Sequence, residues 1–83
     1  MNVKVLGLGC AKCKKLFAEA EKAVAQAGLA ATLEKIERLE EIVGFGVMLT
    51  PALVIDGEVK CSGRVAPAGE IVAWLESAAA RNG

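Results

Sequence analysis

Histidine and tyrosine are absent from this chain of 83 residues, and its aromatic residues are limited to Phe17, Phe45 and Trp74. A structural zinc site takes four nitrogen or sulfur ligands, which three cysteines without a histidine do not supply. Hydrophobic residues make up 54% of the chain, and many of them are alanine. We therefore expect a core of close-packed helices laid on a small sheet.

Neither sign of charge is in excess, since ten lysine and arginine residues balance ten aspartate and glutamate residues. The basic cluster is limited to Lys12, Lys14 and Lys15, so we expect no nucleic-acid partner. No apolar run approaches the roughly 20 residues that span a bilayer, and residues 1–8 are too few for the core of a signal peptide. We expect residues 1–83 to form one monomeric domain in the cytoplasm, without a membrane partner.

The three cysteines do not suggest a secreted disulfide framework, because they cannot all pair and two of them lie three positions apart. Cysteines at i and i+3 in the first turn of a helix have Cα atoms about 5 Å apart, which a disulfide accepts. In a reducing compartment, Cys10 and Cys13 are therefore a redox-active or metal-binding pair.

The hydrophobic pattern predicts an α/β chain in the order strand, helix, strand, helix, strand, strand, helix. We expect strands over residues 2–6, 29–36, 52–55 and 58–62, and helices over 11–27, 37–43 and from Pro67 onward. Gly28 ends the first helix, and Asp56-Gly57 closes an antiparallel hairpin. With a parallel pairing of the first two strands, this gives a four-stranded mixed sheet flanked by three helices.

Alternation in the last strand places Val59 and Cys61 on one face, with Glu58, Lys60 and Ser62 on the other. Cys61 could be a third redox thiol. Its shared face with Val59 favours a core position, where cysteine behaves as a small hydrophobic residue.

Position favours Cys10 as the nucleophile of the pair. It lies at the start of the predicted helix, where unpaired N–H groups and the positive end of the helix dipole stabilise a thiolate. Lys12 and Lys14 either lower the pKa of Cys10 further or form a solvated helix face. Cys13, one turn further on, would resolve the mixed disulfide.

Three segments carry a family resemblance: GLGCAKC at residues 7–13, TPALVIDG at 50–57 and SGRV at 62–65. They resemble the small archaeal and bacterial thioredoxin-like redox disulfide proteins, and the likeness covers nearly the whole chain. The resemblance implies a thioredoxin fold and a thiol–disulfide oxidoreductase that reduces protein disulfides. The redox-active Cys10–Cys13 disulfide would be its only redox group, and a thioredoxin-reductase-like protein would be its electron donor.

The same resemblance assigns a role to Thr50 and Pro51. It implies a cis peptide bond between them, at the start of a strand antiparallel to the first, so that Pro51 lies against the sulfurs of Cys10 and Cys13. The Thr50 backbone would pair with an extended substrate segment, and the proline ring would keep metal ions off the thiolates. From the residues alone, Pro51 also fits an ordinary proline at the start of a strand.

The chain departs from larger thioredoxins, which have tryptophan before the first cysteine and Gly-Pro between the two. Here these positions hold Gly9 and Ala11-Lys12. Larger thioredoxins also carry a buried aspartate on the strand before the motif, whereas residues 1–9 contain no acid. Deprotonation of Cys13 must therefore use water or another group.

Two other chemistries are alternatives to protein disulfide reduction. Glutaredoxins carry a tyrosine in the cysteine motif and an acidic glutathione site, and this chain has no tyrosine and no acid in residues 62–64. A copper carrier is the main alternative, because heavy-metal-associated domains also place CxxC after a first strand, and Gly7 fits their pattern. Leu8 stands where those domains usually have methionine, and the Thr50-Pro51 segment has no counterpart in them.

Overall fold

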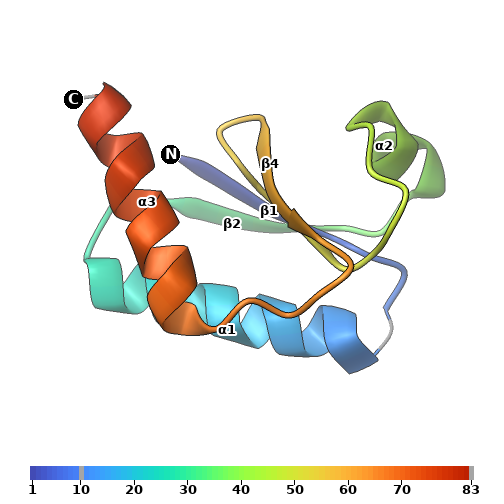
Figure 1. The fold of residues 1–83 in the computed structure, drawn as a ribbon, viewed down its shortest axis with the longest axis horizontal. Coiled ribbons are helices and arrows are strands. Elements are labelled where there is room, and N and C mark those ends of the chain that lie inside the picture. Colours follow the sequence, from blue (N-terminus) through green and yellow to red (C-terminus); the bar gives the residue numbers. More distant parts are fainter. Residues whose placement is uncertain (10, 83) are drawn as a thin grey trace.

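The computed structural model describes residues 1–9 and 11–82. Its elements are β1 (Asn2–Leu6), α1 (Ala11–Ala27), β2 (Thr32–Ile36), α2 (Leu39–Gly44), β3 (Ala52–Ile55), β4 (Glu58–Ser62) and α3 (Ala68–Asn82), as Figure 1 shows. The four strands form one sheet in the order β2-β1-β3-β4. β1 and β2 are parallel, and the other neighbouring strands are antiparallel, which confirms the predicted mixed sheet with three helices.

The helices cover the two faces of the sheet unequally. Successive residues of a strand point to opposite faces. β3 buries both sets, whereas β1 buries Val3 and Val5 on one face and, on the other, Leu6 alone. Val5 and Leu53 pack in the larger core with α1 and α3, whereas Leu6 and Val54 pack in a smaller core with α2. Figure 1 shows α1 and α3 together on one side of the sheet and the short α2 well apart from them.

The sequence of α1 explains its length and its packing. Cys13, Leu16, Ala20 and Ala23 recur every three or four residues and form its buried stripe. The helix ends where Gly28 takes a positive φ of 65° and its N–H donates to the Val24 carbonyl at 3.2 Å. The predicted bounds of this helix are confirmed.

The start of α3 is tied to α1 by a side chain. The Glu19 carboxylate accepts a hydrogen bond from the Ala68 backbone N–H at 3.1 Å, and it also pairs with Lys22 at 3.0 Å. The hydrogen bond from Lys22, and then that from Ala68, hold the pKa of Glu19 below its usual value of 4.5. Glu19 thus supplies from another helix the cap that α3 lacks in its own sequence.

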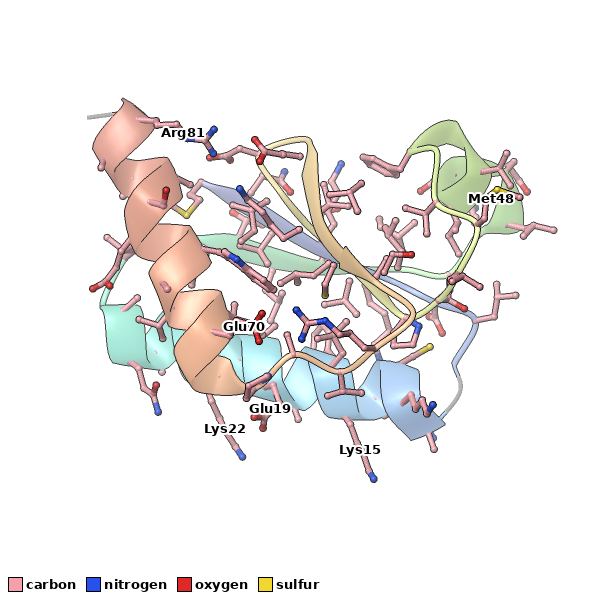
Figure 2. All side chains as sticks on the ribbon, viewed as in Figure 1. Lys15, Glu19, Lys22, Met48, Glu70 and Arg81 are labelled. Carbon is pink, nitrogen blue, oxygen red and sulfur yellow. The ribbon has the colours of Figure 1, made fainter. Side chains whose placement is uncertain are left out.

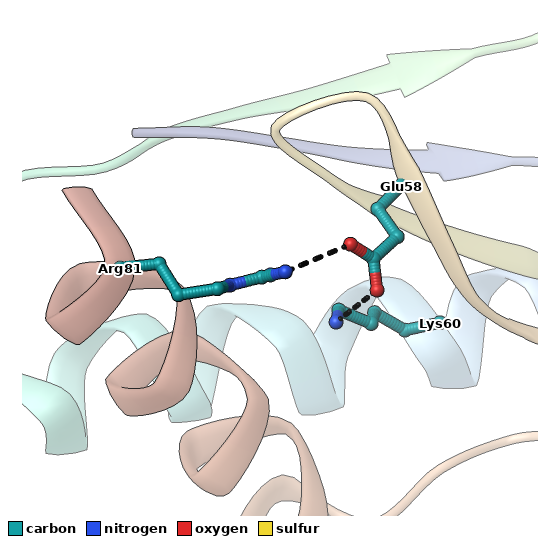
Figure 3. Close-up of polar contacts among 3 residues, drawn as sticks. All are labelled: Glu58, Lys60 and Arg81. Carbon is teal, nitrogen blue, oxygen red and sulfur yellow. Dashed lines mark hydrogen bonds and ion pairs between the residues drawn. The ribbon is translucent and has the colours of Figure 1, made fainter.

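The last turn of α3 contacts the hairpin through charged groups (Figure 3). Arg81 donates to one oxygen of Glu58 at 3.2 Å, and Lys60 donates to the other at 2.7 Å. These hydrogen bonds, that from Lys60 first, lower the pKa of Glu58. The pairs connect β4 to α3 at the edge of the sheet.

Two predicted boundaries were wrong at their N-terminal ends. The second strand begins at Thr32 rather than Leu29, because its partner β1 begins at Asn2, which pairs with Thr32. The second helix begins at Leu39 rather than Glu37, because Arg38 has an extended backbone with φ −90° and ψ 126°.

The predicted pairing of Val59 and Cys61 on one face was also wrong. Val59 lies opposite Val54 and Cys61 opposite Leu53, since the register shifts between these positions. A β-bulge adds one residue to a strand and so reverses the alternation beyond it. Val59 is 37% exposed, whereas Cys61 is 7% exposed and packs in the larger core, so the predicted burial of Cys61 is confirmed for a different reason.

Candidate active site

The end of β1 and the start of β3 lie side by side at one end of the sheet. Leu6 pairs with Ala52, which brings the segment after β1 close to the segment before β3. The first segment contains Gly7 and leads into α1. Cys10, the predicted nucleophile, lies outside the described residues.

Cys13 is buried in the first turn of α1, with 6% of its surface exposed. Its thiol fills the space beside Gly7: a Cβ added at position 7 would overlap the Cys13 Sγ and lie 2.9 Å from its Cβ. The Gly7 N–H also donates to the Ile36 carbonyl at 3.0 Å, which holds the segment against β2. Gly7 is therefore needed for close approach to Cys13, a role that the sequence analysis did not assign.

The peptide bond between Thr50 and Pro51 is cis, as the resemblance implied. Pro51 is buried, and Thr50 is exposed. The Gly63 N–H donates to the Pro51 carbonyl at 2.8 Å, and the Ser62 hydroxyl donates to the Leu49 carbonyl at 2.9 Å. The segment before β3 is thus held by the end of β4, with Thr50 at the surface.

Of the two lysines predicted to act on Cys10, one lies beside Cys13. Lys12 and Lys14 are both exposed, and Lys14 lines a small cavity that also contains Cys13. The predicted influence of Lys12 and Lys14 on Cys10 stays a prediction, because it depends on a residue outside the described part.

An apolar groove of about 680 Å³ adjoins this end of the sheet. Its lining includes Leu8, Leu39, Val43, Met48 and Thr50. Met48 is 96% exposed and projects from the surface beside α2 in Figure 2. Contiguous exposed apolar side chains mark sites of interaction. The groove was missed from sequence, although the apolar run at residues 47–49 after Gly46 was a possible signal.

Cys61 lines neither the apolar groove nor the small cavity that contains Cys13. Burial raises the pKa of its thiol above the usual 9.0, with Arg64 acting in the opposite direction. A buried thiol with a raised pKa is a poor nucleophile. The structure thus supports the core position of Cys61.

The residues 1–76 match the family model described as a thioredoxin domain. The chain belongs to the thioredoxin family. It is 41% identical over 71 residues to a protein named thioredoxin from Methanothermobacter thermautotrophicus, covering 86% of this chain and 92% of that protein. A protein named thioredoxin from Methanocaldococcus jannaschii is 29% identical over 75 residues, covering 90% of this chain and 86% of the relative.

Membership of the thioredoxin family supports thiol–disulfide oxidoreductase chemistry and gives no support to a copper carrier. The four-stranded mixed sheet and three helices are consistent with the thioredoxin fold. Among the helices of the described residues, none combines the length and the apolarity needed to cross a bilayer.

Proposed function

We propose that the protein reduces disulfides of other proteins through Cys10 and Cys13. The observation that carries this proposal is the burial of Cys13 against Gly7 in the first turn of α1, three residues after Cys10, in a chain of the thioredoxin family. A thiol at the start of a helix suits the nucleophile that captures a target disulfide, which is the role proposed for Cys10. A buried thiol one turn further on suits the resolving role proposed for Cys13, which releases the target.

In the proposed cycle, the Cys10 thiolate attacks one sulfur of a target disulfide. A bond forms between Cys10 and that sulfur, and the other target sulfur leaves as a thiolate and takes up a proton. Cys13 then loses its proton and attacks the Cys10 sulfur, so that the mixed disulfide breaks and the second target thiolate leaves. The target gains two electrons, and the protein is left with a Cys10–Cys13 disulfide, which a thioredoxin-reductase-like donor would reduce again.

The surface beside the site supports proteins rather than glutathione as substrates. The apolar groove contains Leu39, Val43 and Met48, whose exposed side chains would contact apolar residues flanking a target disulfide. Thr50 is exposed at the rim of this groove, where its backbone could pair with an extended target segment. We propose that this reduction takes place in the cytoplasm, with the protein acting as a monomer.

Trapping the intermediate tests the proposal. Reduced Cys13→Ser protein, incubated with a disulfide-bearing protein such as insulin, should accumulate a mixed disulfide through Cys10, because the resolving thiol is missing. Non-reducing electrophoresis and peptide mass spectrometry would identify the linked cysteine. Cys61→Ala is the matched control, since it removes a thiol outside the site and should leave turnover with a dithiol donor intact.

Three results would contradict the proposal. The first is accumulation of adducts by Cys10→Ser but not by Cys13→Ser, which would reverse the roles of the two cysteines. The second is that both thiols are inert in the folded protein at neutral pH. The third is tight binding of copper(I) together with no reduction of insulin, which would favour the metal carrier.

A further inference from the structure

The apolar groove at the reactive end of the sheet is lined by one residue whose side chain an oxidant can change. Met48 is 96% exposed, whereas Leu8, Leu39 and Val43, the other exposed apolar residues of the lining, are 60%, 59% and 62% exposed. Met48 therefore presents more of its side chain to solvent, or to a bound target, than any of these three.

The residues on both sides of Met48 are held by the fold. Val47, which precedes it, is buried in the smaller core with Leu6. Leu49, which follows it, is tied to β4, because its carbonyl accepts a hydrogen bond from the Ser62 hydroxyl at 2.9 Å. The outward position of Met48 therefore follows from the course of the backbone, and not from the rotamer of one side chain.

The other sulfur atoms of residues 1–9 and 11–82 are shielded from solvent. Cys13 is 6% exposed and Cys61 is 7% exposed, and Met1 is partly buried against the larger core. A thioether has no proton to lose before it reacts with an oxidant, so access to solvent governs its reaction. Within the described part of the chain, Met48 thus carries the most accessible sulfur.

We propose that Met48 is a site of reversible oxidation by peroxide, and that its sulfoxide weakens the binding of targets in the groove. The thioether sulfur attacks one oxygen of hydrogen peroxide, so that an S–O bond forms and the O–O bond breaks. The other oxygen leaves as water with both peroxide hydrogens. The sulfur loses two electrons, and the peroxide gains them. A methionine sulfoxide reductase reverses the change by supplying two electrons, and the oxygen then leaves as water.

This inference rests on the proposed function, in which the groove contacts apolar residues that flank a target disulfide. Oxidation converts a flexible apolar side chain into a polar one. Water solvates the sulfoxide oxygen, and a bound apolar side chain would displace that water without replacing its hydrogen bond. The loss should weaken the binding of an apolar target by about three- to tenfold.

The change would outlast the redox cycle of Cys10 and Cys13. Thiol–disulfide exchange transfers electrons between sulfur atoms and has no step that removes oxygen from a sulfoxide. After exposure to peroxide, the dithiol would be restored by its donor while the groove remained polar. Target binding would therefore stay weak until a sulfoxide reductase acted on Met48.

Peptide mapping tests the site of oxidation. Protein in the disulfide form is treated with hydrogen peroxide at neutral pH, because the disulfide protects Cys10 and Cys13 from the same oxidant. Mass spectrometry then follows the gain of one oxygen in the peptides that contain Met48 and Met1, the two methionines of the chain. We expect Met48 to react faster than Met1. Equal rates, or a faster reaction of Met1, would overturn the inference.

Two synthetic peptides test the effect on targets. Each contains one disulfide, flanked by leucine in the first peptide and by serine in the second. After oxidation of Met48, the KM for the leucine-flanked peptide should rise about three- to tenfold. Its kcat and the KM for the serine-flanked peptide should change by less than about 1.5-fold, because the cysteines are untouched. Equal rises in KM for the two peptides, or a rise below about twofold for the first, would overturn the inference.

Variants separate Met48 from other effects of peroxide. Met48→Gln should raise the KM for the leucine-flanked peptide without any oxidant, because its amide is polar like a sulfoxide. Val59→Gln is the matched control, since Val59 is an exposed apolar residue that does not line the groove. Met48→Leu has no thioether, so peroxide should leave its own KM unchanged. Equal rises in Met48→Gln and Val59→Gln, or a rise in treated Met48→Leu as large as in wild-type protein, would overturn the inference.

The failure of this inference can be distinguished from the failure of the proposed function. If untreated wild-type protein reduces neither peptide, the proposed function fails. Calorimetry with the leucine-flanked peptide, carrying serine in place of its cysteines, then decides the role of Met48. Weaker binding after peroxide supports this role, and unchanged binding overturns it. If both peptides are reduced but peroxide leaves KM unchanged, only the role of Met48 fails. Circular dichroism of each variant establishes that the compared proteins are folded.

Discussion

At the scale of single residues, Gly7 shows how closely the site is packed. The Cys13 thiol occupies the space that a side chain at position 7 would need. We expect Gly7→Ala to displace Cys13 and to lower the free energy of unfolding by about 1–3 kcal/mol, the usual effect of overpacking. Urea unfolding measures the stability, and the lifetime of the mixed disulfide measures the effect on resolution.

Gly69→Ala is the control for this substitution. Gly69 lies in α3, where an added Cβ meets no atom within 4 Å and alanine favours the helix. It should therefore leave the mixed disulfide unaffected and raise stability slightly. Similar destabilisation in the two variants would show that Gly7 has no special role beside Cys13.

The sequence was a good guide to the local structure at Cys13 and Pro51 and a poor guide to what surrounds them. The motif placed Cys13 in the first turn of a helix, and the resemblance implied the cis peptide bond before Pro51. Their roles in the reaction stay predictions. The close approach of Cys13 to Gly7 was not predicted, because it depends on how the segment after β1 lies against α1, which no local pattern reveals.

At the scale of elements, the docking of α3 depends on Glu19. Because this carboxylate accepts from the Ala68 N–H and from Lys22, we expect Glu19→Ala to lower the melting temperature at neutral pH. The depressed pKa of Glu19 means that its contribution is present above the usual 4.5 and is lost as the pH falls through the lower folded value. The difference in melting temperature between Glu19→Ala and wild-type protein should therefore become smaller in acid.

Thermal unfolding followed by circular dichroism, at neutral pH and in acid, checks this expectation. Glu21→Ala is the matched control, because Glu21 is an exposed glutamate on the same helix. If Glu19→Ala lowers the melting temperature no more than Glu21→Ala does, the Glu19 carboxylate does not cap the start of α3.

The order and type of every element followed from periodicity and turn residues, but some boundaries did not. The start of β2 depends on where β1 begins, and the bulge in β4 depends on its fit against β3. Both are contacts between segments that are separate in the sequence. A strict alternation rule therefore placed Val59 with Cys61, although the two lie on opposite faces.

At the scale of the whole molecule, acid should destabilise the fold. Hydrogen bonds from neighbouring cations lower the pKa values of Glu19, Glu58 and Glu70 from 4.5. Each carboxylate adds stability above its unfolded pKa, and this is lost as the pH falls through its folded pKa. We expect the free energy of unfolding to be nearly constant from about pH 7 to 5 and to fall below about pH 4.5.

Urea titrations over this range of pH measure the effect. Because the ion pairs are exposed, the acid-dependent loss should become smaller when the salt concentration is raised. A free energy of unfolding that stays constant into strong acid would show that these carboxylates do not contribute to the folded state.

The proposed reactive end of the sheet joins its two inner strands, each of which has a neighbour on both sides. The outer strands β2 and β4 can open transiently without separating β1 from β3. Fraying of β2 or β4 would remove the hydrogen bond of Gly7 to Ile36 or that of Gly63 to Pro51, but it would leave the pairing of Leu6 with Ala52 in place. In so short a chain, the central pair of strands would thus keep the two segments at the reactive end together while the outer strands open.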